Sequence, residues 1–211
     1  LLGKKISMKG RFLIQEAYGL DTLSGLVKFI IRIVRGTFIV EGIGAVLFSF
    51  KFVPEFGLAK GIWYGVFHSI SGFCNAGIDI IGDSSFMRYV DSPLVSLTTM
   101  FLIVMGGLGF PVWHDIFVTA KKGAGEKGAR RRIFTRLGLQ SKIVLTITAF
   151  LIIFGTVGYF LLEFNNPETM KDLSIPEKVL ASAFQSVTTR TAGFASVSQS
   201  GLSESSRLLG C

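Results

Sequence analysis

The chain has 211 residues, of which 49% are hydrophobic and only 17% are charged, and its formal net charge is +8. Together with a mean hydropathy of +0.55, this composition excludes an ordinary soluble domain and indicates a membrane protein. The positive charge does not indicate nucleic-acid binding, because the basic residues are not spread along an aromatic-interleaved surface.

The first predicted element is a short amphipathic helix within residues 1–25, which we expect to form a cytoplasmic tail at the membrane surface. Its apolar residues recur at helical spacing on one side: Phe12, Leu13, Ala17 and Leu20. The chain begins with leucine and no signal segment leads it, so the expectation is a piece of a longer protein.

Three apolar runs follow, at residues 29–52, 93–118 and 143–162. Each is close to the ~20 residues that a helix needs to cross the hydrocarbon core. Pro111 should kink the second run or end its straight part, because proline cannot donate a backbone hydrogen bond. The glycines just before it, Gly106, Gly107 and Gly109, are expected to allow close helix packing.

The distribution of charge predicts how these runs cross the membrane. Basic residues gather before the first run and in residues 119–142, whereas residues 163–178 carry most of the acidic side chains of the later loops. The positive-inside rule makes the basic segments cytoplasmic. The predicted organisation is a cytoplasmic tail (1–25), a complete unit of span, pore loop and span (26–118), a basic cytoplasmic loop facing membrane lipids (119–142), and an incomplete second unit without its closing span (143–211).

Two short segments end in near copies of one signature, FHSISGFCNAG at residues 67–77 and FQSVTTRTAG at residues 184–193. Each is too short to cross a bilayer and stops at a small-residue turn, so each is predicted to enter from the outside and return. The spacing of about 116 residues between the two copies indicates parallel internal repeats around an axis that encloses a path.

Turns of this kind suit ion conduction, because backbone carbonyls can surround a dehydrated cation without adding a full negative charge. Glycine allows the required backbone angles, and both short helices aim their negative ends at the turn. The predicted filter residues are Asn75, Ala76, Gly77 and Ile78 in the first turn and Thr191, Ala192, Gly193 and Phe194 in the second. Asp79 and Asp83 would raise the cation concentration at the outer mouth.

Two further charged residues are predicted to support the filter. Glu41 lies in the middle of the first span, where an ionisable side chain either faces the ion path or props up the pore helix. Arg190 precedes the second turn, and its guanidinium is expected behind the filter, bonded to helix-end carbonyls or a carboxylate. No metalloprotease or nucleophile-elbow motif is present, so the sequence does not favour an enzyme.

Residues 67–71, 75–77, 106–110 and 185–194 resemble the Ktr/Trk/HKT potassium transporters, and most closely the bacterial Ktr membrane subunit. The resemblance covers nearly the whole chain and matches Gly77 and Gly193 to the single filter glycine of each repeat. It implies four such units in one polypeptide, of which this chain would hold the end of the first, all of the second and most of the third. It also implies K+ uptake, a homodimer of membrane subunits and a cytoplasmic nucleotide-binding regulatory subunit.

The sequence therefore predicts an all-α integral membrane protein of the cell membrane that is not an enzyme and takes up K+ through a channel-like pore. The pore would be built from repeated units of helix, re-entrant pore loop and helix, and no cofactor is expected. Two alternatives stay open: a membrane scaffold subunit that does not conduct, and a Na+-selective member of the same family or one with Na+ as coupling or activating ion.

Overall fold

The computed structural model describes residues 26–82, 85–123 and 133–211. The amphipathic helix expected in residues 1–25 and the expected outer-mouth residue Asp83 lie outside these ranges. The chain divides into two compact units, Leu1–Val40 and Glu41–Cys211. The described part of the first unit belongs to helix α2, and all the contacts discussed below lie within the second unit.

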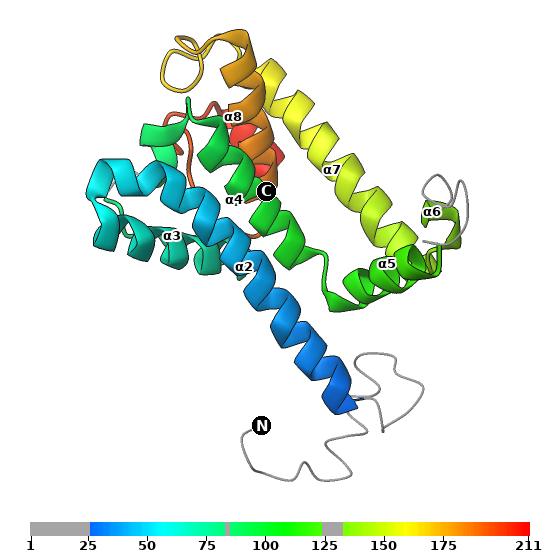
Figure 1. The fold of residues 1–211 in the computed structure, drawn as a ribbon. Helices are drawn as coiled ribbons and strands as arrows, with labels where there is room; N and C mark the ends of the chain where they lie inside the picture. The colour runs from blue at the N-terminus through cyan, green and yellow to red at the C-terminus, as the bar shows by residue number, and fades with distance from the viewer. Residues whose placement is uncertain (1–25, 83–84, 124–132) are drawn as a thin grey trace. The chain divides into compact units, whose positions relative to one another are not determined.

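Every regular element in the described residues is a helix, which confirms the predicted all-α fold (Figure 1). In chain order these elements are α2 (Leu26–Phe56), α3 (Leu58–Phe73), the 3-10 helix η2 (Ser85–Tyr89), α4 (Pro93–Gly107), α5 (Phe110–Gly123), α6 (Ile133–Arg136), α7 (Leu139–Glu163), α8 (Ile175–Thr188) and α9 (Glu204–Gly210).

Two helices of the described chain are each long and apolar enough to cross a membrane by themselves. One is the 27-residue segment Ile30–Phe56 of α2, and the other is the 25-residue helix Leu139–Glu163, which is α7. Both exceed the ~20 residues that a span requires. The first and third apolar runs of the sequence are thus continuous helices of spanning length.

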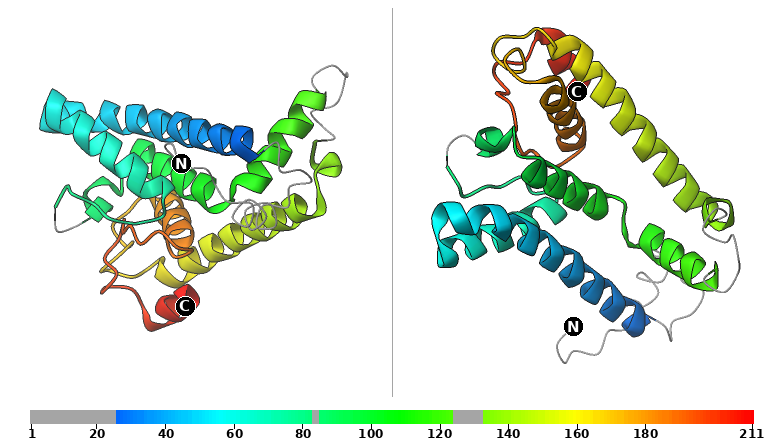
Figure 2. Two further views of the ribbon diagram at one scale, coloured as in Figure 1. Left: turned by 90° about the horizontal axis from the view of Figure 1, so that it is seen from below. Right: turned by 45° about the horizontal axis from the view of Figure 1, so that its top comes forward.

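The second apolar run is instead a bent pair, in which α4 and α5 meet at 96°. The change of direction can be followed in the left view of Figure 2. Gly109 lies at the break with φ +81°, a left-handed conformation that glycine adopts at little cost. Pro111, the second residue of α5, cannot donate a hydrogen bond back across the break. The kink expected at Pro111 is therefore present, and the pair counts as a third span only if both halves are taken together.

Helices α3 and α8 have 16 and 14 residues, so each is shorter than a span. Helix α3 follows α2 after the single residue Gly57, whose φ of +82° reverses the chain. Helix α8 begins with a capping box, in which Ser174 and Glu177 each bond the other's backbone N–H. Such a box satisfies the free N–H groups of a first turn.

Small residues let α3 lie directly against α2. A side-chain carbon at Gly61 would come within 2.5 Å of Val53 Cα, and one at Gly65 within 2.8 Å of the carbonyl oxygen of Ala45. Any larger residue at these positions would separate the helices.

Helix α8 packs against both α7 and α4, and α4 in turn packs against α3 (Figure 1). Gly106 makes the last contact close, because a side-chain carbon there would overlap the carbonyl oxygen of Phe73 at the end of α3. The packing role expected for Gly106 is confirmed. Helix α4 thus separates the two short helices and brings their C-terminal ends to the same region.

Candidate ion-conduction site

The turns that follow α3 and α8 meet in space. A side-chain carbon placed on Gly77 would overlap the carbonyl oxygen of Ala192 and lie 3.0 Å from the carbonyl carbon of Gly193. One placed on Gly193 would lie 3.9 Å from Gly77 Cα. The fold therefore brings the two copies of the signature, which are far apart in the sequence, into backbone contact.

Both glycines adopt the left-handed backbone conformation, with φ +64° at Gly77 and +85° at Gly193. This is the freedom for which glycine was expected at these positions. Asn75 also has a positive φ, +52°, which asparagine tolerates better than most residues. The first turn thus contains two left-handed residues and the second turn contains one.

The additional left-handed residue accounts for a shift of register between the copies. Phe184 follows Phe67 by 117 residues, whereas Gly193 follows Gly77 by 116. The short helices therefore align at one offset and the turns at another. Asn75 absorbs the extra residue within the first turn.

One hydroxyl-bearing residue near the end of each short helix holds both sides of its turn. The Ser71 hydroxyl donates to the carbonyl oxygen of Ile78 at 2.6 Å, and the Thr188 hydroxyl donates to that of Phe194 at 2.7 Å. The carbonyl of the same residue accepts the N–H of the alanine before the glycine, at 2.9 Å in both copies. The glycine of each turn is thereby enclosed by hydrogen bonds from a single helix residue.

A second equivalent pair fastens each short helix to the long helix before it. The Ser69 hydroxyl of α3 donates to the carbonyl oxygen of Glu41 in α2 at 2.6 Å, and the Ser186 hydroxyl of α8 donates to that of Ile152 in α7 at 3.0 Å. The described hydrogen bond that links Glu41 to α3 is thus made by its backbone and not by its carboxylate.

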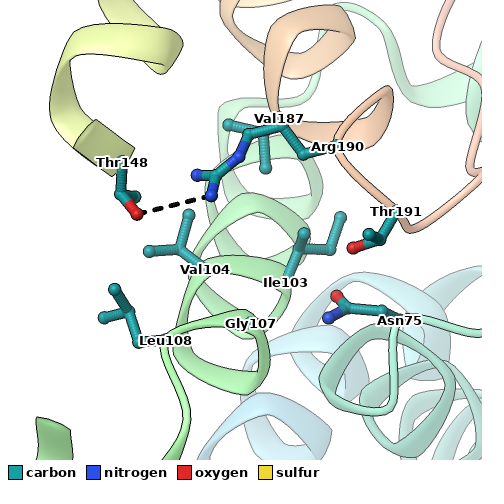
Figure 3. Close-up of a pocket in the computed structure, with 9 residues that line it drawn as sticks. All are labelled: Asn75, Ile103, Val104, Gly107, Leu108, Thr148, Val187, Arg190 and Thr191. Carbon is teal, nitrogen blue, oxygen red and sulfur yellow. Dashed lines mark hydrogen bonds between the residues drawn. The ribbon is translucent and has the colours of Figure 1, made fainter. Parts of the chain in front are cut away.

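A cavity of about 380 Å³ lies beside the two turns, and α4, α7 and α8 line it. Its lining residues are Asn75, Ile103, Val104, Gly107, Leu108, Thr148, Val187, Arg190 and Thr191. Figure 3 shows the Arg190 guanidinium extending across it toward Thr148, whose hydroxyl accepts a hydrogen bond from Nη2 at 3.3 Å. The expectation of a carbonyl or carboxylate partner for Arg190 is therefore not met, because the described partner is a hydroxyl.

The remaining predicted site residues differ in exposure between the copies. Ala192 and Phe194 in the second turn are buried, whereas Ala76 and Ile78 in the first are exposed. Asp79 follows the first turn and is half-buried. Within the described ranges no three His, Cys, Asp or Glu side chains gather as metal ligands.

Comparison with known protein families identifies the family of this chain. The profile of a family described as TrkH, cation transport protein, matches residues 15–209. The chain belongs to the TrkH cation transport family. Its spanning helices, its short helices and its two turns all lie within the matched region, so the TrkH chain is an integral membrane protein.

Several curated relatives resemble this TrkH chain along most of its length. It is 39% identical over 194 residues to the potassium/sodium uptake protein NtpJ of Enterococcus hirae, covering 92% of this chain and 40% of that protein. It is 40% identical over 197 residues to Ktr system potassium uptake protein B of Vibrio alginolyticus, covering 93% of this chain and 41% of that protein. The chain thus spans about two fifths of the length of these relatives.

Sequence reasoning missed the residues that hold the turns, Ser71 and Thr188, and those that fasten the short helices, Ser69 and Ser186. A signal for them was present, since aligning the copies at Phe67 and Phe184, rather than at the glycines, places a serine opposite a serine and a serine opposite a threonine. The alignment at the glycines hides both pairs because the first turn is one residue longer.

Proposed function

We propose that this chain forms part of a potassium uptake pore, in which the turns at residues 75–78 and 191–194 supply backbone oxygens to the selectivity filter. The observation that carries the proposal is the contact of two equivalent turns, each with a left-handed glycine held by the same two hydrogen bonds. The relatives' names, potassium/sodium uptake protein and Ktr system potassium uptake protein, favour K+ as the ion.

The chemistry required of such a site is modest. A K+ ion that loses its water needs several oxygens at fixed distances, and carbonyl groups provide them without binding the ion too tightly. Helices α3 and α8 both end immediately before a turn, so the negative ends of their dipoles favour a cation there and disfavour an anion. Ser71 and Thr188 fix the backbone, because each bonds to both sides of its glycine.

The surroundings of the pore follow from the same proposal. Asp79 lies at the outer mouth and attracts cations, while the basic segment of residues 119–142 faces the cytoplasm and anionic lipid headgroups. Arg190 and Glu41 support the turns from behind. The complete pore includes further repeats of the same polypeptide, and we propose a homodimer that a cytoplasmic nucleotide-binding subunit regulates.

The test is tracer Rb+ uptake in a cell that lacks its own K+ transport and expresses the full-length gene, with and without competing Na+. We expect uptake by the wild type, and weaker discrimination against Na+ in the Gly193→Ser variant. A well-expressed wild type without uptake would favour a scaffold subunit instead. Wild-type uptake that Na+ competes away fully would favour the Na+-selective alternative, which the name of the Enterococcus relative keeps in view.

A further inference from the structure

We propose that Glu163, at the end of α7, is a positioning residue that holds the chain segment after the second filter turn and thereby sets the ion preference of that turn. The inference rests on the proposed function, since it concerns the same pore. It assigns a role to a carboxylate that touches neither the turn nor the ion.

Glu163 is an unusual residue for its surroundings because its side chain is fully buried, with 0% of its surface exposed. Its Oε2 accepts hydrogen bonds from Asn166 Nδ2 and Thr169 Oγ1, both at 2.6 Å. Its Oε1 accepts from the backbone N–H of Ser203 at 3.0 Å and from the Ser203 hydroxyl at 2.7 Å. A buried carboxylate is tolerated only with such partners, and here they come from two segments, the loop directly after α7 and Ser203 some 40 residues later in the chain.

The donors explain why a carboxylate is needed. The Ser203 N–H and the NH₂ group of Asn166 can only donate, and an ionised carboxylate can only accept. A glutamine in its place would point an NH₂ group at one of these donors, whichever way its amide is turned. The substitution is nearly equal in shape and yet leaves buried donors unpaired.

The segment that Glu163 holds begins at the second filter glycine. Four contacts fasten the chain after Gly193. Thr188 bonds the carbonyl of Phe194, and the side-chain amides of Gln185 and Gln199 bond each other. Farther along, Asn166 bonds the carbonyl of Gly201, and Glu163 bonds the N–H of Ser203. Residues 194–197 are all buried. The carboxylate is therefore the far anchor of a segment that is buried next to the filter turn and partly exposed at residues 198–200.

The first copy has a weaker counterpart at a different position. The two spans, α2 and α7, can be aligned at Gly44 and Gly155, because these glycines lie against Ser69 and Ser186. In this alignment Phe52 stands opposite Glu163. There the carboxylate lies three residues later, at Glu55, which accepts the Tyr89 hydroxyl at 2.9 Å.

An ion pair of 3.9 Å also joins Glu55 to Arg88. Both copies therefore tie the chain after the turn to a carboxylate at the end of the preceding span. Because the Glu55 side chain is 32% exposed and that of Glu163 is buried, we expect the second anchor to matter more.

The experiment compares Rb+ uptake in cells expressing full-length wild type, Glu163→Gln, Glu55→Gln and Glu168→Gln. Glu168 is the matched control, because it is an exposed carboxylate on the same loop. We expect Glu163→Gln to raise the apparent KM for Rb+ about tenfold and to weaken discrimination against Na+, with a normal amount of protein in the membrane. The effect of Glu55→Gln should be smaller, and Glu168→Gln should behave as wild type.

Each outcome is decisive. A lower maximal rate and less protein, with unchanged KM and Na+ discrimination, would make Glu163 a purely structural residue and overturn the inference. If Glu163→Gln does not accumulate, Thr169→Val, which removes one donor and leaves the carboxylate paired, must show the same KM shift in weaker form for the inference to stand. Absence of uptake by the wild type itself would instead overturn the proposed function.

Discussion

Replacing three left-handed glycines with alanine separates the cost of backbone conformation from the cost of contact between the turns. Gly57, Gly77 and Gly193 have φ of +82°, +64° and +85°, so alanine pays a similar conformational cost of about 1–2 kcal/mol at each. A side-chain carbon has nothing within 4 Å at Gly57 and an ordinary 3.9 Å contact at Gly193, but at Gly77 it overlaps the carbonyl oxygen of Ala192. Overpacking adds about 1–3 kcal/mol, so Gly77→Ala should lose roughly 2–5 kcal/mol in total.

Thermal unfolding of the purified full-length protein in detergent measures the first consequence, and Rb+ uptake against Na+ measures the second. We expect Gly57→Ala and Gly193→Ala to be destabilised equally and Gly77→Ala clearly more. The preference for Rb+ over Na+ should be unchanged in Gly57→Ala, weaker in Gly193→Ala and weakest in Gly77→Ala. The reasoning is wrong if Gly77→Ala is no less stable than Gly57→Ala, or if Gly57→Ala alters ion preference as much as the two turn variants.

Two further predictions concern charges near the turns. Asp79→Asn should lower Rb+ uptake about threefold at low external Rb+ and should have little effect at saturation. The factor is the one by which a unit negative charge about 6 Å away raises the local concentration of a monovalent cation in water. Asp91→Asn, which changes an exposed carboxylate between α3 and α4, is the control, and an equal loss at both Rb+ concentrations would argue against a role at the mouth. For Arg190 and Thr148, a double-mutant cycle of unfolding free energies with Arg190→Gln and Thr148→Val should give a coupling of about 1 kcal/mol. Additive effects would mean that the 3.3 Å hydrogen bond contributes nothing.

The sequence predicted the features that depend on local composition. Apolar runs of the right length gave the spans, Pro111 predicted the break between α4 and α5, and the Asn-Ala-Gly and Thr-Ala-Gly turns predicted glycines in unusual backbone conformations. Each of these follows from a few neighbouring residues, because hydrophobic length and backbone freedom are properties of a short stretch of chain.

The anchors of the turns depend on residues far apart in the sequence and could not be predicted in this way. Glu163 looks like one more acidic residue of an outer loop until Ser203, 40 residues later, is seen to donate to it. Arg190 was expected to bond a carbonyl or a carboxylate, but the group within its reach is the hydroxyl of Thr148, 42 residues earlier. Which partner is near is decided by how α7 and α8 pack, and no local pattern records that packing.

The two copies also differ in a way that agrees with the proposed backbone filter. Side chains that bond to the main chain have nearly the same chemistry in both copies, with serine opposite serine and serine opposite threonine. Side chains that contact the loop after the turn differ between the copies. In the first copy His68 accepts the N–H of Ile80 at 3.3 Å. At the equivalent position of the second copy, Gln185 bonds the side-chain amide of Gln199. A filter of carbonyl oxygens requires equal backbone geometry in each repeat but not equal side chains. Under the proposed function, the constraint falls on the hydroxyl groups that fix the backbone, while the residues of the loop after each turn can differ between the copies.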